Sequence, residues 1–541
     1  MKRTIKALMD LANLRQFFIA FFISMIALNL YFYFYMPMLL WNLVLTAPPL
    51  LVGLYDVTQT SHTILRNFPI IGHFRYVLEA IRPEINQYFI ESNQDGKPFS
   101  RELRSLIYQR SKRVLDTIPF GTQDDVYATG YEWITHSFAP KHFSAQQLRI
   151  MVGGDECKHK YNASIMNISA MSYGALSTNA IRALNGGAKD GNFAHNTGEG
   201  GISPYHLENG GDLIWQIGTG YFGCRNRDGT FNGDLFKEGA QRPEVKMIEL
   251  KLSQGAKPGH GGILPKEKVT REIADIRKIV MGEDVLSPPG HSAFSTPIEL
   301  CLFIQKMREL SGGKPVGFKF CLGKRYEFIS VCKAMIETGI LPDYIAVDAG
   351  EGGTGAAPAE FSNSVGFPGI DGQLFVHNAL IGFGLRRRIR LIASGRLVTG
   401  FHVIKRLALG ADMVYSARAM MMAMGCIQAL RCNNNTCPTG IATQDKRLVA
   451  GLVPSIKRDR VKNYHAETMK STAELLGAIG LNELNQLRPF HIIRRASPQR
   501  HYTYDELFEF IPDGSLLGPN VPSSFKFYLE GTKASSFDRN A

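Results

Sequence analysis

The chain has 541 residues, of which 53 are glycine and 26 are proline, and 45% of its residues are hydrophobic. This composition indicates a loop-rich globular protein and excludes a disordered chain. The net charge is +13, but the basic residues form no run interleaved with aromatic residues. The charge therefore favours anionic small ligands or anionic lipid as partners, and we expect no nucleic acid.

Positions 16–55 contain no Lys, Arg, Asp, Glu or His. A membrane-spanning helix needs about 20 apolar residues, so this run is long enough for two helices with a turn at Met36–Pro37. Basic residues precede and follow the run, which places both of its ends on the cytoplasmic side. We expect residues 1–56 to anchor the protein in the inner (cytoplasmic) membrane as a transmembrane hairpin, with the catalytic body in the cytoplasm. A single tilted span followed by a buried apolar segment is the alternative.

Residues 57–150 are mixed and polar, and we expect them to form a helical collar. From about residue 160, strand-like runs that end in glycine-rich turns alternate with helical segments. This alternation predicts an α/β fold with a parallel sheet, and its length suits a (β/α)8 TIM barrel over residues 151–455. A doubly wound sheet is the alternative, but no Gly-x-Gly-x-x-Gly motif opens a helix after the first strand. Residues 456–541 are expected to form a helical tail.

Three cysteines, Cys426, Cys432 and Cys437, lie within twelve positions, and a proline follows the last. Thiolate ligands beside a Cys-Pro turn are typical of an iron–sulfur cluster, and three of them suit a cluster that lacks one corner iron. Three reduced thiols packed in a core are the alternative. A disulfide is disfavoured because the other cysteines are scattered singly along the chain.

The last two predicted strands end in Ser394–Arg396 and Ser416–Arg418. Glycine and serine let the backbone approach a phosphate, and arginine supplies paired donors. In a barrel, a phosphate site commonly follows strands seven and eight, so we expect one here. The glycine-rich loop at 348–355 also predicts a closely approached ligand, because four nearby glycines are entropically costly in an ordinary turn.

Three charged residues are candidates for chemistry inside the barrel mouth. Glu199 and Lys257 lie in glycine-rich loops, where acid–base residues often occur. Lys319 lies between two phenylalanines in an apolar strand, where an unpaired ammonium group would be costly to bury. We therefore expect Lys319 to face an anionic ligand.

From Ser169 to Gln444 the chain resembles the FMN-binding synthase domain of glutamate synthase. The motifs that carry the resemblance are Ala170–Ser177, Thr197–Gly201, Gln254–Gly259, Ser287–Pro289, Val316–Lys319, Gly352–Ala356 and Cys437–Gln444. The N-terminal part looks like that of the stand-alone, membrane-anchored bacterial branch of the family. The resemblance implies a (β/α)8 barrel with bound FMN, a [3Fe-4S] cluster on Cys426, Cys432 and Cys437, and catalytic roles for Glu199 and Lys257 beside the flavin and a 2-oxoacid.

The matching motifs and the strand-end loops together give the residues expected to bind FMN. They are Met171, Ser172, Gly174, Gln254, Lys319, Gly352, Gly353, Thr354, Gly355, Ser394, Gly395, Arg396, Ser416 and Arg418.

The chain departs from the family pattern at the oxoacid end of the site. Ile263 stands where the family has a glutamine, and Ile202 stands where it has an acidic residue. We expect no amidotransferase domain, and because the second residue is Lys2, we also expect the family's N-terminal cysteine nucleophile to be absent. Ammonia is thus expected to come from solution or from another subunit.

The resemblance predicts reductive amination of a 2-oxoacid, 2-oxoglutarate to glutamate, with FMN and the cluster carrying the electrons. No NAD(P)-binding fingerprint is present, so we expect an external electron donor, either ferredoxin-like or a flavoprotein subunit. Two alternatives remain open. One keeps the barrel and cofactors for another substrate, such as an amino or methylamine transfer, and the other is a membrane-bound electron-transfer module.

Overall fold

The computed structural model describes residues 14–33, 35, 41–114 and 117–539. The chain divides into two compact units, Met1–Arg101 and Glu102–Ala541. The predicted collar, 57–150, therefore does not form one unit: its helices up to residue 101 belong with the N-terminal unit, and the rest belongs with the C-terminal unit.

The N-terminal unit is helical. Its elements are α2 (Leu14–Tyr33), α3 (Trp41–Thr58), α4 (Thr63–Asn67), α5 (Ile71–Ile85) and the π-helical turn η3 (Asn86–Ile90). Helices α2 and α3 pack closely at Gly53, which has no Cβ; a Cβ there would lie 2.0 Å from the Phe18 ring. The buried carboxylate of Asp56 accepts hydrogen bonds from Ile70 N at 2.9 Å and from His73 Nε2 at 2.9 Å, which joins the end of α3 to α5.

Within the described part of the chain, one helix is long and apolar enough to cross a membrane, at Gln16–Tyr33. Helix α3, expected as the second span, does not reach that standard. It contains Pro48 and Pro49 and carries Asp56 near its end. The predicted pair of spans is therefore not found among the described residues. The prediction treated residues 16–55 as uniformly apolar because they carry no charge. The second half of this run, in α3, is less apolar than the first half, in α2.

The C-terminal unit is built on a closed barrel of eight parallel strands. In chain order they are β4 (Met166–Ile168), β5 (His195–Asn196), β6 (Leu213–Ile217), β7 (Val245–Lys251), β10 (Val316–Cys321), β11 (Tyr344–Asp348), β12 (Arg390–Ser394) and β13 (Met413–Ser416). Strand β13 pairs in parallel with β4 and closes the ring. The (β/α)8 prediction is confirmed, and the doubly wound alternative is wrong.

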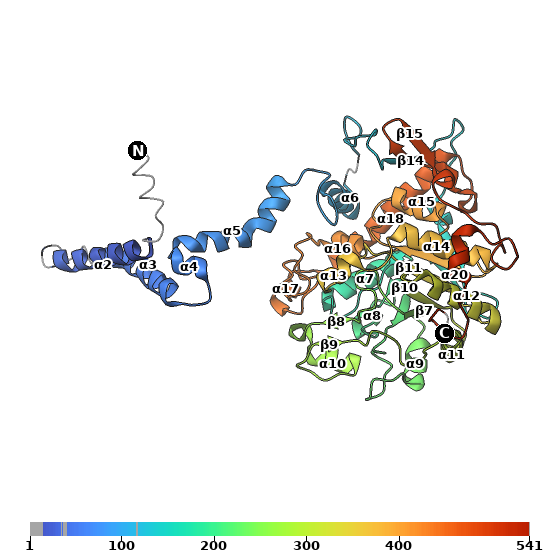
Figure 1. The fold of residues 1–541 in the computed structure, drawn as a ribbon, viewed down its shortest axis with the longest axis horizontal. Coiled ribbons are helices and arrows are strands. Elements are labelled where there is room, and N and C mark those ends of the chain that lie inside the picture. The colour runs from blue at the N-terminus through green and yellow to red at the C-terminus, as the bar shows by residue number, and fades with distance from the viewer. Residues whose placement is uncertain (1–13, 34, 36–40, 115–116, 540–541) are drawn as a thin grey trace. The chain divides into compact units, whose positions relative to one another are not determined.

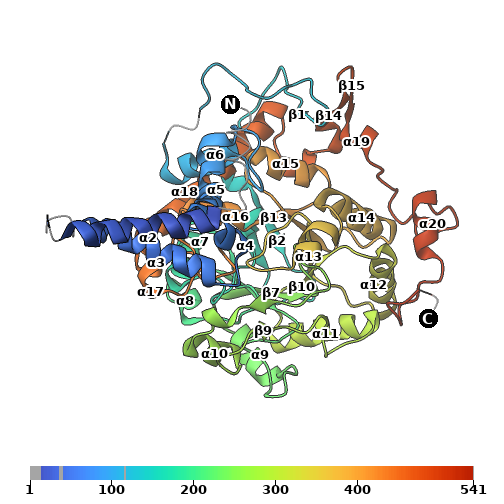
Figure 2. The same cartoon turned by 60° about the vertical axis from the view of Figure 1, so that its left-hand side comes forward.

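Helices surround these strands, as Figures 1 and 2 show. They are α7 (Thr178–Gly191), α8 (Pro204–Leu207), α9 (Gly233–Ala240), α11 (Pro297–Leu310), α12 (Arg325–Thr338), α14 (Gly369–Gly382), α15 (Gly400–Ala408), α16 (Arg418–Met424) and α18 (Pro454–Ile479). Local sequence fixes where several of them begin. The Thr296 hydroxyl accepts a hydrogen bond from Glu299 N, for example, and the Glu299 carboxylate accepts one from Thr296 N, as in a capping box. The main apolar core lies between these helices and the strands.

An insertion separates β7 from α11. It comprises β8 (Ile263–Leu264), the 3-10 turn η5 (Lys266–Lys268), α10 (Arg271–Arg277) and β9 (Val285–Leu286), with β8 and β9 paired antiparallel. The remaining elements before the C-terminal segment are α6 (Arg101–Lys112), β1 (Glu132–Ile134), η4 (Ala145–Gln147), the hairpin β2 (Arg149–Val152) and β3 (Tyr161–Ser164), α13 (Ala359–Ser364) and α17 (Lys446–Ala450).

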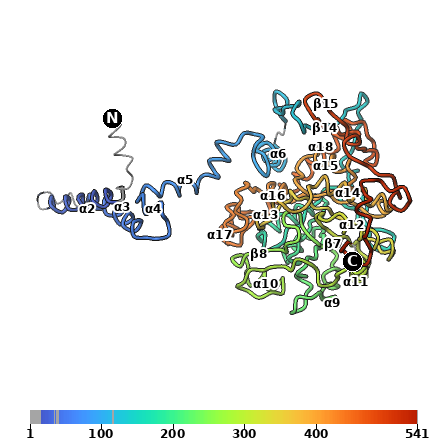
Figure 3. The backbone as a smooth tube through the Cα atoms, in the orientation of Figure 1, coloured from blue at the N-terminus to red at the C-terminus, as the bar shows by residue number. Residues whose placement is uncertain are grey.

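The C-terminal segment, predicted as a helical tail, is helical only in part. Helix α18 packs on the barrel helices α7, α15 and α16, and it is followed by η6 (Leu484–Gln486), η7 (Pro489–His491), β14 (Ile492–Ser497), β15 (Arg500–Thr503), α19 (Tyr504–Leu507) and α20 (Ser523–Leu529). Strand β14 pairs antiparallel with both β15 and β1. Further on, the red end of the chain in Figure 3 runs past α14 to α12, where Arg325 Nη1 donates to the Tyr528 hydroxyl at 2.8 Å.

Candidate active site

Glu199 lies in the loop that follows β5, at the carboxyl end of the barrel strands. Its Oε1 is 2.9 Å from Lys251 Nζ, at the end of β7. A Cβ on Gly262 would lie 2.3 Å from Glu199 Oε1, and a Cβ on Gly218 would lie 2.5 Å from Oε2. Glycine at both positions therefore leaves room for the carboxylate. Burial would raise the pKa of Glu199, but Lys251, Lys257 and Arg277 outweigh it and lower that pKa, so the group is ionised.

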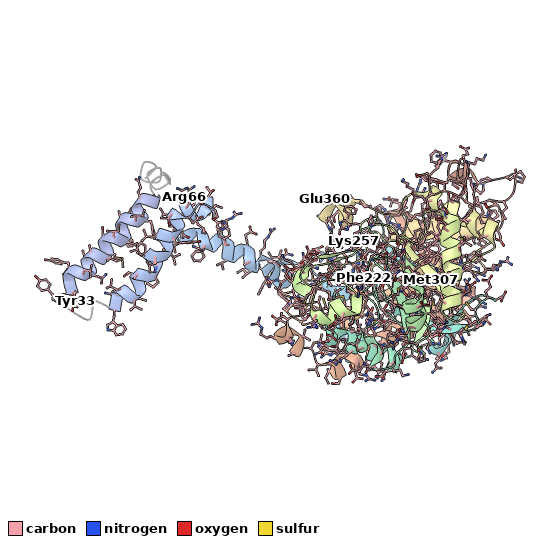
Figure 4. The ribbon with its side chains drawn as sticks, turned by 90° about the horizontal axis from the view of Figure 1, so that it is seen from below. Tyr33, Arg66, Phe222, Lys257, Met307 and Glu360 are labelled. Atoms are coloured by element: carbon pink, nitrogen blue, oxygen red, sulfur yellow. The ribbon has the colours of Figure 1, made fainter. Side chains whose placement is uncertain are left out.

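Lys257 is buried near Glu199, and Figure 4 labels it in the barrel unit. Its Nζ donates a hydrogen bond of 2.8 Å to the carbonyl oxygen of Ala356, in the glycine-rich loop after β11. Burial and the neighbouring charge of Lys251 lower the pKa of Lys257 to about 8, against the opposing effect of Glu199. The amine can therefore gain or lose a proton near neutral pH, as a catalytic lysine must.

Lys319 has a partner within the chain, and its predicted contact with an anionic ligand stays a prediction. Its Nζ lies 3.3 Å from Asp348 Oδ2. Lys319 is opposite Ala346 in the β10–β11 register, and Asp348 follows two residues later on the same face of β11. The Asp348 carboxylate also accepts hydrogen bonds from Ser394 Oγ and from Gly255 N. This carboxylate joins the ends of three strands and the loop after β7.

The loops after the seventh and eighth strands carry two neighbouring guanidinium groups. Burial and the charge of Arg396 lower the pKa of Arg418 to about 10. Gly395 has a φ of +111°, and a Cβ there would lie 2.3 Å from the Ala349 Cβ, so the turn requires glycine. Arg396 follows this turn and Arg418 follows the next strand, and two neighbouring guanidinium groups of this kind can supply paired donors to a phosphate.

The glycine-rich loop after β11 carries further residues that we expected to bind FMN. Arg418 Nη2 donates to the carbonyl oxygen of Glu351, and a Cβ on Gly353 would lie 2.8 Å from Arg418 Cδ, so this part of the glycine loop packs on the arginine. Gly355 has open space around it, and Thr354 donates to Ala356 O within its own loop. Gly352 N donates to Ala349 O at 2.7 Å, which tightens the turn. Contact of these loop residues with FMN stays a prediction.

The side chains of Ser394, Ser416 and Gln254 form hydrogen bonds with other residues of the chain. Ser416 Oγ donates to Leu397 O at 2.9 Å, and Ser394 Oγ donates to Asp348. Gln254 Oε1 accepts a 2.6 Å hydrogen bond from Lys251 Nζ. These residues shape the site through their protein partners, and their contact with FMN stays a prediction.

The loop after β4 carries Met171, Ser172 and Gly174, which we expected to bind FMN. Met171 is buried, and its N–H donates to Asn196 O at 3.3 Å. Arg277, at the end of α10, donates from Nη2 to Tyr173 O at 3.1 Å and to Ser172 Oγ at 3.4 Å. The insertion thus holds this loop against the barrel mouth.

Sequence reasoning missed Lys251, Arg277 and Asp348. Asp348 ends a predicted apolar strand and Lys251 ends β7, and strand ends are the positions where barrel enzymes carry functional groups, so a signal was present. Arg277 ends a short helix in the insertion, and nothing in the sequence indicates that it is buried. Its guanidinium lies over the Phe222 ring at 5.3 Å, and burial lowers its pKa to about 10.

Cys426, Cys432 and Cys437 are free thiols that lie within electrostatic range of one another. Burial raises the pKa of Cys426 to about 12, and the other two sulfurs add to that effect. Burial would also raise the pKa of Cys437. The Thr439 hydroxyl and the N–H groups of Ala442, Thr439 and Ile441 outweigh it and lower that pKa. Hydrogen-bond donors therefore converge on the Cys437 sulfur and stabilise it as an anion.

Among the described residues, no group of three or more His, Cys, Asp or Glu side chains is arranged to hold a single metal ion. In an iron–sulfur cluster each thiolate binds a different iron, so the three sulfurs need not converge on one point. The chemistry of the donors, three thiols with hydrogen bonds to sulfur, fits such a cluster. The [3Fe-4S] assignment stays a prediction.

The comparison with known proteins decides the family. Residues 136–482 match the family model described as a conserved region in glutamate synthase. The chain belongs to the glutamate synthase family. It is 37% identical over 481 residues to the glutamate synthase large subunit-like protein YerD of Bacillus subtilis (strain 168), which covers 81% of this chain and 91% of that protein.

This family member is also 37% identical over 330 residues to the archaeal glutamate synthase [NADPH] of Methanocaldococcus jannaschii, covering 61% of each protein. The chain thus spans less than two thirds of that relative. Among solved structures, mandelate oxidase with 3,3-difluoro-2-hydroxy-3-phenylpropionic acid aligns with 71% of this chain and 97% of its own at 14% identity and a TM-score of 0.42. A likeness at that level carries no argument about ligands. Family membership makes the chain a glutamate synthase-like oxidoreductase.

Proposed function

We propose that this chain is an FMN-dependent oxidoreductase that aminates a 2-oxoacid reductively, converting 2-oxoglutarate and ammonia to glutamate, with ammonia supplied from outside the chain. The observation that carries the proposal is the group of charges at the strand ends. There the ionised Glu199 pairs with Lys251, and Lys257 carries an amine with a pKa of about 8. An anionic oxoacid needs cations, and the reaction needs groups that can hold and release protons near pH 7.

The proposed FMN site fits the residues present. Arg396 and Arg418 lie together after the last two strands and would hold the phosphate, and the tight turn at Gly395 lets the backbone approach it. When bound, FMN supplies the hydride for the reduction. Lys319 stays protonated inside the barrel mouth, since Asp348 and Glu249 outweigh burial and raise its pKa, and the ionised Asp348 carboxylate balances its charge.

Two residues of the chain are proposed to orient the substrate and to handle protons. Lys257, protonated at pH 7, polarises the carbonyl oxygen of the oxoacid and orients it. Glu199 holds or moves a proton at its carboxylate, and its pairing with Lys251 keeps that carboxylate in place. Buried groups of this kind typically contribute about 10²–10⁴-fold to a rate.

Electrons are proposed to come from an external donor, either a ferredoxin-like protein or a flavoprotein subunit, through a [3Fe-4S] cluster held by Cys426, Cys432 and Cys437. The donors directed at the Cys437 sulfur support this role.

The N-terminal unit is proposed to attach the protein to the inner (cytoplasmic) membrane through α2, with the catalytic unit in the cytoplasm. Removal of residues 14–33 would then shift the protein from the membrane fraction to the soluble fraction, and retention in the membrane fraction would argue against this role of α2.

The test of the function is substrate-driven reoxidation of the flavin. The anaerobic, detergent-solubilised protein is reduced and mixed with 2-oxoglutarate and ammonia while flavin absorbance is recorded. The Lys257→Met variant should keep its flavin and reoxidise at least about 10²-fold more slowly. Lys266→Gln, which removes an exposed lysine from the insertion, is the matched control and should react like the natural chain.

Two results would redirect the assignment. Reoxidation by another oxoacid or amine donor, but not by 2-oxoglutarate with ammonia, would keep the barrel and change the substrate. Ile202 and Ile263, both half-buried, give this alternative its support, because they are apolar at the expected oxoacid end. A protein with flavin that no 2-oxoacid with ammonia reoxidises would instead be an electron-transfer module.

A further inference from the structure

The side chain of Lys268 is buried beside the cysteine segment, and no carboxylate of the described residues pairs with it. It is 2% exposed, and its Nζ donates to three carbonyl oxygens: Cys432 at 2.6 Å, Ala442 at 2.8 Å and Ala175 at 3.2 Å. These bonds use all three N–H donors of the ammonium group. They satisfy its hydrogen bonding but leave its positive charge uncompensated.

A buried ammonium group is costly unless an anion lies near it. Lys268 forms no ion pair with any carboxylate among the described residues, and the ionisable groups that act on it are the sulfurs of Cys432 and Cys437. Negative charge on these sulfurs, or on a group bound to them, is therefore the compensation that the fold provides. A thiolate-bound iron–sulfur cluster would be such a group.

The same lysine joins the cysteine segment to the loop after β4. Ala175, one of its acceptors, lies in that loop close to Ser172 and Gly174. Gln444 makes a parallel connection, since its Nε2 donates to Gly174 O at 3.1 Å and to Leu176 O at 2.9 Å. The positive charge is thus held in a fixed place between the cysteines and the proposed flavin site.

The neighbours of Lys268 in the insertion hold the same loop. Glu272 Oε2 accepts a 2.6 Å hydrogen bond from the Tyr173 hydroxyl, and Arg277 donates to Tyr173 O. Three charged side chains of residues 268–277 therefore contact residues 172–175. The insertion forms the structural link between the two proposed redox sites.

We propose that Lys268 is a positioning residue that acts as the fixed counter-charge of the group bound by Cys426, Cys432 and Cys437 and raises its reduction potential. This inference rests on the proposed cluster. A nearby positive charge stabilises the more negative, reduced state of a cluster, because attraction is strong where water is excluded. Loss of that charge therefore makes the cluster harder to reduce.

The test compares three variants of the full-length, detergent-solubilised protein. Lys268→Gln keeps hydrogen-bond donors but removes the charge, Lys268→Arg keeps the charge, and Lys266→Gln removes an exposed charge two residues away. Iron and sulfide content and low-temperature EPR first establish whether the natural chain holds a three-iron cluster. Absence of a cluster there would be a failure of the proposed function, and it is distinguishable from the outcomes that follow.

Redox titration of the EPR signal then tests the inference itself. At the midpoint potential of the natural protein, Lys268→Gln should show a reduced-to-oxidised ratio about tenfold lower, which is a shift of about 59 mV for one electron. Lys268→Arg and Lys266→Gln should stay within about threefold of the natural protein. A midpoint in Lys268→Gln equal to that of Lys266→Gln would overturn the proposal.

A second readout does not depend on the cluster. In iron-free protein, Lys268→Gln should exchange amide hydrogens as slowly as the natural chain over residues 172–177, because Gln444 still holds that loop, whereas Lys268→Gln combined with Gln444→Ala should exchange faster. Flavin content reports whether the barrel is intact. Loss of the cluster from Lys268→Gln but not from Lys268→Arg would support the counter-charge, and loss from both variants with flavin retained would overturn it.

Discussion

The pKa of Lys257 gives a quantitative prediction for the affinity of the oxoacid. Burial, together with the charge of Lys251, lowers this pKa from 10.5 to about 8. The protonated amine attracts a carboxylate, so binding is strong below the pKa and weakens as the pH rises through it. The apparent Kd scales with one plus the ratio of neutral to protonated amine. That factor is about 1.1 at pH 7 and about 11 at pH 9, so the affinity should fall about tenfold.

The assay is calorimetric titration of the oxidised, flavin-loaded protein with 2-oxoglutarate between pH 6.5 and 9.5, without ammonia or an electron donor. Both carboxylates of 2-oxoglutarate stay ionised over this range, so the protein alone sets the profile. Lys257→Arg should give a flat profile because its guanidinium stays charged. An ordinary exposed lysine, with a pKa near 10.4, would also give a flat profile up to pH 9.

Glu199 supplies the decisive control for this reasoning. Its negative charge raises the pKa of Lys257, so Glu199→Gln should lower that pKa and move the loss of affinity to a lower pH. A flat profile for the natural chain up to pH 9.5 would refute the assignment of Lys257 to the oxoacid. A profile that moved to higher pH in Glu199→Gln would refute the electrostatic picture of the site.

Two further predictions concern the proposed phosphate turn and the cysteines. Gly395→Ala should lower the free energy of unfolding by about 2–6 kcal/mol, from a strained φ and an overlap with Ala349. A double-mutant cycle measured by denaturant unfolding separates the two causes. Adding Ala349→Gly should recover the free energy lost to the overlap but not the free energy lost to the strained φ. A coupling energy of zero between the two substitutions would contradict the close contact. Cys432→Ser or Cys437→Ser should abolish bound iron in elemental analysis, whereas Cys332→Ala, on α12, should retain it. Equal iron in all three variants would remove the cysteines from the proposed cluster.

The barrel could be predicted from the sequence because its elements are local. Apolar strands such as Tyr344–Asp348 are short runs that lead into glycine-rich turns, and the helices between them begin at caps such as Thr296 and Thr399. Periodicity and capping are properties of neighbouring residues, so they can be read without the fold. The positions of Glu199 and Lys257 in strand-end loops followed from the same pattern.

The parts that could not be predicted depend on contacts between distant segments. Strand β1 pairs with β14, so Glu132 lies opposite Arg494. The residues around either strand contain no sequence pattern that predicts this pairing. The burial of Arg277 and the partner of Lys319 are likewise decided by elements far apart in the chain. Length and the absence of charge predicted two membrane spans, but the prolines within Trp41–Thr58 make the second run a weaker candidate than the first.

Gly262 shows how a backbone position can set the chemistry of the site. A methyl group at this position would lie 2.3 Å from Glu199 Oε1 and 3.1 Å from Ser287 Oγ. Because such an approach is impossible, Gly262→Ala must displace the Glu199 carboxylate from Lys251, from which it is now 2.9 Å away. The carboxylate would then support the charge of Lys257 less well, so the pH profile of oxoacid binding should move to lower pH, in the same direction as in Glu199→Gln but by less.

The matched control for Gly262→Ala is Gly323→Ala, in the loop after β10, where a Cβ would meet nothing within 4 Å. It should leave the profile and the stability unchanged within about 0.5 kcal/mol. If Gly262→Ala binds the oxoacid with the natural profile, then the carboxylate tolerates displacement and its distance from Lys251 does not govern Lys257. If both glycine variants shift the profile, the effect arises from general loosening of the barrel mouth, since only one of the two substitutions touches Glu199.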